Sequence, residues 1–111
     1  MKNIYLDNAA TTPLRPEVIH TMVDVLQHDF GNPSSTHSFG RSSKSILETS
    51  RKTIAKHLNC SAQEIIFTAN ATEGTNWILR EMVKNNGIKK IITSKIEHHA
   101  TLYTVLNLQK E

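Results

Sequence analysis

The sequence predicts an α/β fold in which a parallel sheet is flanked by helices. Two short apolar segments, 64–68 and 91–93, each follow one helical pattern and precede another. Strands that alternate with helices in this way indicate parallel pairing with right-handed crossovers. The alternation stops after the last helical pattern, so we expect an incomplete parallel sheet with flanking helices.

The N-terminal residues are predicted to form an extended arm followed by a helix. Residues 1–14 show no apolar period, and Pro13 disfavours helical backbone at the residue before it. Pro16 suits the first turn of a helix, and apolar residues recur at helical spacing as far as Gln27. We therefore place an arm over 1–14 and a helix over 16–27.

A structured loop and a long amphipathic helix are expected next. Residues 30–37 have turn-forming side chains at nearly every position, and Ser34 or Ser35 is a candidate N-cap. Apolar residues then recur at helical spacing over 39–59, with small serines between them. The serines predict that this helix packs closely against another element.

The C-terminal half shows a turn, two helices and the two strand candidates. Ser61 and Glu64 have the spacing of a capping box, but only a single turn fits before the first strand candidate, so this turn is expected to be short or absent. A helix is predicted over 72–84, where an Asn-Asn-Gly sequence gives stop signals, and the last helix begins after His98.

Composition excludes several function classes. With 38% hydrophobic and 21% charged residues the 111-residue chain is globular in character. Its net charge of +3 comes from scattered basic residues, which argues against nucleic-acid binding. No signal peptide and no apolar run of about 20 residues is visible, so we expect a cytoplasmic protein that does not bind a membrane.

The turn from Ala69 to Asn76 has the pattern of an anion-binding site. It links a strand candidate to a helix through small residues, and the N–H groups at a helix N-terminus bind phosphate with help from the macrodipole. The Thr72 hydroxyl can add a further hydrogen bond. The alternative is an ordinary connection in which Thr serves only as a cap.

Two further residue types were considered for chemistry. His98 follows the second strand candidate, where an imidazole can stack on a planar ligand, and ligands of parallel sheets bind beyond the carboxyl ends of strands. Thr72 and His98 are therefore expected at the same edge of the sheet. His98 and His99 do not form a metal pair because adjacent helical residues diverge, and Cys60 is read as a structural thiol.

Taken together, these residues give a resemblance to the N-terminal part of the class V aminotransferase-like, pyridoxal phosphate dependent cysteine desulfurases. Four separated motifs carry it, in order along the whole chain. They are Tyr5 to Pro13; Gly31 to Ser35 with His37, Gly40 and Arg41; Glu64 to Thr68 with Ala71, Thr72, Glu73 and Asn76; and Thr93, Ser94, Glu97, His98 and Ala100.

The resemblance implies the start of a fold-type I, PLP-binding large domain over 15–111, preceded by the arm over 1–14. It implies pyridoxal 5'-phosphate as cofactor, with Ala71 and Thr72 binding its phosphate and His98 stacking on its ring. The implied reaction converts L-cysteine to L-alanine with sulfur transfer to an enzyme persulfide, for iron-sulfur cluster or tRNA thiolation supply. A homodimer and a sulfur-acceptor protein are the implied partners.

Two departures from the family pattern qualify these expectations. Ala69 and Asn70 replace the family's usual Ser-Gly, and we expect Asn70 to be tolerated because Asn adopts left-handed backbone more readily than most residues. No residue here matches the family's Schiff-base lysine or its catalytic cysteine, so the 111-residue chain is predicted to be inactive. The alternative function is a small non-catalytic domain that binds a phosphorylated ligand or a partner protein.

Overall fold

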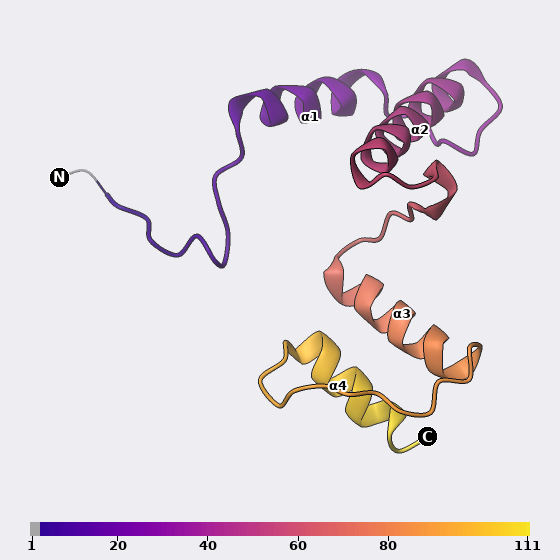
Figure 1. The fold of residues 1–111 in the computed structure, drawn as a ribbon. Helices are drawn as coiled ribbons and strands as arrows, with labels where there is room; N and C mark the ends of the chain where they lie inside the picture. The colour runs from indigo at the N-terminus through magenta and orange to yellow at the C-terminus, as the bar shows by residue number, and fades with distance from the viewer. Residues whose placement is uncertain (1–2) are drawn as a thin grey trace. The chain divides into compact units, whose positions relative to one another are not determined.

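The computed structural model describes residues 3–111 and shows four α-helices and one short 3-10 helix (Figure 1). The helices are α1 (Pro16–His28), α2 (Ser38–Leu58), α3 (Ala71–Lys84) and α4 (His99–Leu108), and the 3-10 helix η1 covers Ala62–Glu64. Each predicted helix is confirmed to within two residues at its ends. The chain divides into two compact units, which meet in sequence between Ile65 and Ile66.

In the first unit, the boundaries of α1 and α2 follow local backbone chemistry. Pro16 occupies the first turn of α1, where its missing N–H is not needed. Asn59 ends α2 in left-handed backbone (φ 53°), and the N–H of Cys60 then donates to the carbonyl oxygen of Ala55 at 3.0 Å. Asn is one of the few residues that adopt this conformation at low cost.

The loop between α1 and α2 packs tightly against the start of α2. The Ser43 hydroxyl donates to the Asp29 carbonyl oxygen at 2.7 Å, and both Gly40 and Ser43 are buried. A Cβ atom added at Gly40 would lie 2.6 Å from the carbonyl oxygen of Asn32. At the first turns of α2 the close packing is therefore against this loop, whereas the sequence predicts packing of the serines against another element.

The N-cap of α2 differs from the prediction. Neither Ser34 nor Ser35 caps the helix; His37 does, and its Nδ1 accepts the N–H of Gly40 at 3.4 Å. Ser34 is part of a separate turn, in which its N–H donates to Asn32 Oδ1 at 2.9 Å. The helix therefore begins at Ser38, directly after His37.

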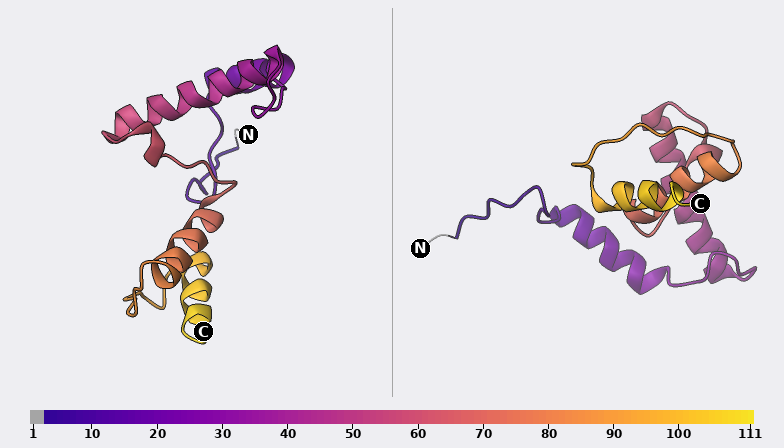
Figure 2. Two further views of the ribbon diagram at one scale, coloured as in Figure 1. Left: turned by 90° about the vertical axis from the view of Figure 1, so that its right-hand side faces the viewer. Right: turned by 90° about the horizontal axis from the view of Figure 1, so that it is seen from below.

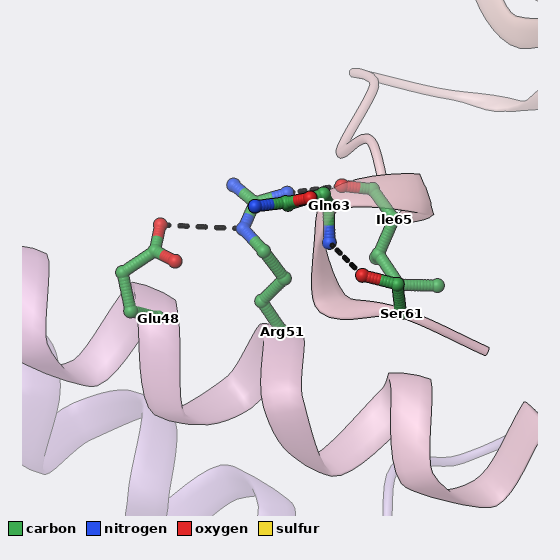
Figure 3. A network of polar contacts seen from close by, with 5 residues as sticks. All are labelled: Glu48, Arg51, Ser61, Gln63 and Ile65. Atoms are coloured by element: carbon green, nitrogen blue, oxygen red, sulfur yellow. Dashed lines mark hydrogen bonds and ion pairs between the residues drawn. The ribbon is translucent and has the colours of Figure 1, made fainter. Parts of the chain in front are cut away.

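A capping box fixes the single turn η1, as the spacing predicted. The Ser61 hydroxyl accepts the N–H of Gln63 at 3.3 Å, and the Glu64 carboxylate accepts the N–H of Ser61 at 2.7 Å. Arg51 of α2 donates to the carbonyl oxygen of Ile65 and lies 3.2 Å from a carboxylate oxygen of Glu48 (Figure 3). These contacts anchor the turn to α2.

The second unit is a pair of packed helices, α3 and α4, joined by an irregular segment. The two helices lie side by side in all views (Figures 1 and 2). Gly87 has a positive φ of 67° and lets the N–H of Ile88 reach back to the carbonyl oxygen of Met82 at 3.0 Å. The Glu111 carboxylate lies 3.4 Å from the Arg80 guanidinium and 3.6 Å from the Lys84 ammonium.

The predicted sheet is not formed, which corrects the expectation for 64–68 and 91–93. Neither segment is a strand, and no strand occurs anywhere in residues 3–111. A strand is stable only when its backbone pairs with another strand, and a parallel pair needs a crossover that brings two strands together. The apolar sequence alone does not supply that partner.

The apolar surface is largely uncovered. Ala55 is the one buried apolar side chain among the described residues, whereas Ile92 and Ile96 are 92% and 94% exposed. A fully buried aliphatic side chain contributes about 1.5–3 kcal/mol to folding, so this chain gains little from its largest apolar groups. None of the helices that the structure describes is long and apolar enough to cross a membrane.

Candidate functional site

The N-terminus of α3 is ordered by Asn70, which is its N-cap. The Asn70 side-chain oxygen accepts the N–H of Glu73 at 2.9 Å, and its carbonyl oxygen accepts the N–H of Gly74 at 3.3 Å. Asn70 has a φ of −165°, which is extended backbone open to any residue. The expected left-handed conformation is therefore not used, and Asn70 is favoured here for its capping amide.

Two further hydrogen bonds fix the turn that leads into α3. The Glu73 carboxylate accepts the N–H of Ala69 at 2.6 Å, and the Thr68 hydroxyl donates to the Asn70 carbonyl oxygen at 3.1 Å. The N–H groups of Ala71 and Thr72 have no acceptor among the described residues. These are the unpaired donors that an anion uses at a helix N-terminus.

His98 stands at the equivalent position of α4. It is the N-cap, and its Nδ1 accepts the N–H of Ala100 at 3.1 Å. A ring nitrogen that accepts a hydrogen bond carries no proton, so Nε2 is the ring nitrogen left to donate. The cap fixes the ring in place and leaves His98 exposed to a ligand.

The α3–α4 packing brings Thr72 and His98 together. Both line one open cavity of about 330 Å³, although the sheet that suggested their proximity is not formed. Ala71 does not line this cavity. The cavity is lined by Thr72, Asn76, His98, His99, Ala100, Tyr103, Thr104 and Asn107.

Aromatic side chains form one wall of the cavity. The rings of His99 and Tyr103 stack with their centroids 5.1 Å apart and their planes at 26°. The rings of His98 and His99 are 6.2 Å apart and tilted by 44°.

Sequence reasoning missed a polar link between the two helices. Asn76 Nδ2 donates to the Thr72 carbonyl oxygen at 2.9 Å, and the Thr104 hydroxyl lies 2.7 Å from Asn76 Oδ1 and 2.8 Å from the Ala100 carbonyl oxygen. Thr104 is only 3% exposed. Each partner is four residues from the next within its own helix, but nothing in the sequence pairs one helix with the other.

Cys60 lies in the first unit and does not line this cavity. Cys60 is half-buried and directly follows the left-handed residue that ends α2. In the described part of the chain, no three His, Cys, Asp or Glu side chains gather in a way that could hold a metal ion.

Comparison with known proteins places the chain in a family. The aminotransferase class-V family profile matches residues 4–111. Cysteine desulfurase IscS of Dictyoglomus turgidum is 46% identical over 112 residues, which cover 98% of this chain and 28% of that protein. The selenocysteine lyase of Bos taurus is 33% identical, with 99% of this chain and 30% of that protein covered.

A solved structure agrees with the sequence comparison. A NifS-like protein matches with a TM-score of 0.85 and 38% identity over 93% of this chain and 29% of its own. The chain thus spans less than a third of the length of each relative. From its sequence match and its structural match together, the chain belongs to the aminotransferase class V family.

Proposed function

We propose that this chain is the N-terminal, cofactor-anchoring part of a pyridoxal phosphate dependent cysteine desulfurase. The observation that carries the proposal is the shared cavity of Thr72 and His98, each at the N-terminus of one of two packed helices. Thr72, whose N–H is unpaired, lines the cavity from α3, and His98 lines it from the start of α4 with an imidazole ring. This combination fits a flat ligand that bears a phosphate.

The chain's own residues anchor and orient the cofactor. The N–H groups of Ala71 and Thr72 and the Thr72 hydroxyl bind the phosphate, supported by the positive end of the α3 macrodipole. The His98 ring, held by the N–H of Ala100, lies against the pyridine face. Pyridoxal phosphate acts as an electron sink when bound, and the protein supplies its orientation and surroundings.

The proposal extends to the fold of the longer protein. Residues 1–14 form an extended arm, and 15–111 begin a fold-type I large domain. In that domain the segments 64–68 and 91–93 are strands of a parallel sheet, paired with strands from outside this chain. The similarity to the NifS-like structure supports this fold, and the exposed side chain of Ile92 supports a missing neighbour.

The proposed reaction takes L-cysteine to L-alanine and passes sulfur to an enzyme cysteine and then to an acceptor protein. The names of the relatives support the substrate, since the Dictyoglomus turgidum protein is a cysteine desulfurase. The cofactor-binding lysine and the catalytic cysteine belong to the part of the protein that this chain does not span. We place the protein in the cytoplasm as a homodimer.

A chimera tests the proposal directly. The region of the Dictyoglomus turgidum IscS that matches this chain is replaced by residues 1–111, and alanine release from L-cysteine is measured. We expect a purified chimera that contains pyridoxal phosphate and releases alanine. The control carries Thr72→Ala with His98→Ala and is expected to lose the cofactor on dialysis.

Two outcomes contradict the proposal. A folded chimera that binds no pyridoxal phosphate excludes the cofactor-anchoring role. If the control with both substitutions keeps the cofactor as well as the unsubstituted chimera does, the residues that anchor the cofactor lie elsewhere. Binding of inorganic phosphate with no preference for the pyridine ring favours the alternative, a non-catalytic phosphate-binding domain.

A further inference from the structure

We propose that Asn76 and Thr104 form a positioning bridge that sets where the His98 ring lies relative to the phosphate donors of α3. This inference rests on the proposed cofactor-anchoring function and assigns a role to two residues that do not themselves hold the phosphate or stack on the ring. It starts from a polar contact between the two helices that is nearly closed to solvent.

The bridge begins at the first turn of α3. The Asn76 amide uses both of its ends: Nδ2 donates to the Thr72 carbonyl oxygen at 2.9 Å, and Oδ1 lies 2.7 Å from the Thr104 hydroxyl. Because the donating end is committed to Thr72, the oxygen is the end that faces α4, and the Thr104 hydroxyl can donate to it. The amide orientation is thus fixed by its two partners.

The bridge ends at the first turn of α4. The single proton of the Thr104 hydroxyl is shared between Asn76 Oδ1 and the Ala100 carbonyl oxygen, which lies 2.8 Å away, and the Ala100 N–H donates to His98 Nδ1 at 3.1 Å. Ala100 therefore contacts the bridge through its carbonyl and the His98 ring through its N–H. A shift of α4 at this point moves the His98 ring by the same amount.

Burial gives the bridge its strength. Thr104 is 3% exposed, so water does not readily replace its partner, and a buried polar group without a partner is costly. Within 66–111, the hydrogen bond between Thr104 and Asn76 is also the one side-chain hydrogen bond that joins α3 to α4 directly. The ion pairs of Arg80 and Lys84 with Glu111 join α3 to the chain beyond α4, and they lie near the C-terminal ends of the two helices, away from Thr72 and His98.

The test compares two ligands on the full 111-residue chain. Pyridoxine 5'-phosphate carries the ring and the phosphate but no aldehyde, so it does not react with surface lysines. Inorganic phosphate reports the α3 donors alone. Affinities are measured by phosphorus NMR titration for the wild type and for Thr104→Val, Thr104→Ser and Thr53→Val.

Thr104→Val keeps the shape and removes the hydroxyl. We expect it to weaken pyridoxine 5'-phosphate binding about fivefold, the effect of one net hydrogen bond, and to change phosphate binding less than twofold. Thr104→Ser restores the hydroxyl and is expected to restore ring-dependent affinity. Thr53 makes the same bond to the carbonyl four residues earlier, at 2.9 Å, but on the exposed surface of α2, so Thr53→Val is expected to change neither affinity.

The possible failures are distinguishable. If Thr104→Val loses the same factor of affinity for both ligands, the residue has a merely structural role and the bridge is overturned. Unchanged affinity for both ligands also overturns it. If the wild type binds neither ligand, the proposed cofactor-anchoring function is contradicted, independently of the bridge. The bridge is then decided by amide exchange at Thr101 and Leu102: faster exchange in Thr104→Val, reversed in Thr104→Ser, supports it, and unchanged exchange overturns it.

Discussion

At the residue scale, Thr72 offers both a backbone N–H and a hydroxyl at the start of α3. Thr72 is exposed, lines the cavity shared with His98, and its N–H has no acceptor among the described residues. Thr72→Val keeps the N–H and the β-branched shape but removes the hydroxyl. A hydrogen bond to a charged group contributes about 1.5–3 kcal/mol, so we expect phosphate affinity to fall about tenfold or more.

Phosphorus NMR titration with inorganic phosphate measures this loss. Thr75→Val is the matched control, because Thr75 belongs to the same helix but does not line the cavity. Equal affinity in the wild type and Thr72→Val means that the hydroxyl has no part in anion binding, and the backbone N–H groups alone account for it.

His98 is predicted to act through its ring face. His98→Phe keeps an aromatic face but loses the Nδ1 acceptor of the Ala100 N–H, whereas His98→Ala loses both. We expect pyridoxine 5'-phosphate affinity to decrease from wild type to Phe to Ala, with phosphate affinity nearly constant, because phosphate does not contact the ring. The same titrations measure both. A His98→Ala variant that binds pyridoxine 5'-phosphate as tightly as the wild type contradicts the stacking role.

At the element scale, two glycines in helices are predicted to respond to Ala in opposite directions. A Cβ at Gly40 lies 2.6 Å from the Asn32 carbonyl oxygen, so the loop must shift, and overpacking of this kind costs about 1–3 kcal/mol. A Cβ at Gly74 lies 3.6 Å from Thr68 Oγ1, which is an ordinary contact. Ala is favoured over Gly in a helix by about 1 kcal/mol.

Urea unfolding followed by circular dichroism measures both variants. We expect Gly40→Ala to lower the midpoint and Gly74→Ala to raise it. Each glycine substitution is the control for the other, since both add one methyl group to a helix near its N-terminus. A Gly40→Ala midpoint at or above that of wild type contradicts the tight packing of the loop between α1 and α2.

At the scale of the whole molecule, exposed apolar side chains predict how the chain behaves alone. Ile92 and Ile96 are 92% and 94% exposed, and Leu6 is 85% exposed. Large exposed apolar surfaces mark sites of contact with other proteins. We therefore expect the 111-residue chain to associate in solution, which sedimentation velocity over a concentration series measures.

The segment around Ile92 provides a sharper measurement at this scale. Residues 91–93 make no backbone hydrogen bonds within the described chain, so their amides are expected to exchange with solvent almost as fast as in an unfolded peptide. In the chimera with the Dictyoglomus turgidum IscS, strand pairing is expected to protect them by orders of magnitude. Equal exchange in both proteins contradicts the proposed sheet.

The sequence by itself determined the local structure and the family. The apolar period located α1 to α4, the Ser61–Glu64 spacing gave the capping box of η1, and four separated motifs identified the aminotransferase class V relationship. These features depend on neighbours within a few residues or on residue identity. Helix formation and capping satisfy backbone groups within one segment, so the sequence pattern is sufficient to predict them.

Only the tertiary structure decided which distant residues meet. It left 64–68 and 91–93 without strand partners. It also packed α3 on α4 so that Asn76 meets Thr104. Strand pairing and helix packing join residues far apart in sequence, and their free energy depends on partners that no local pattern specifies. For the same reason, Thr72 and His98 share a cavity through the packing of two helices, not through the sheet that the sequence predicts.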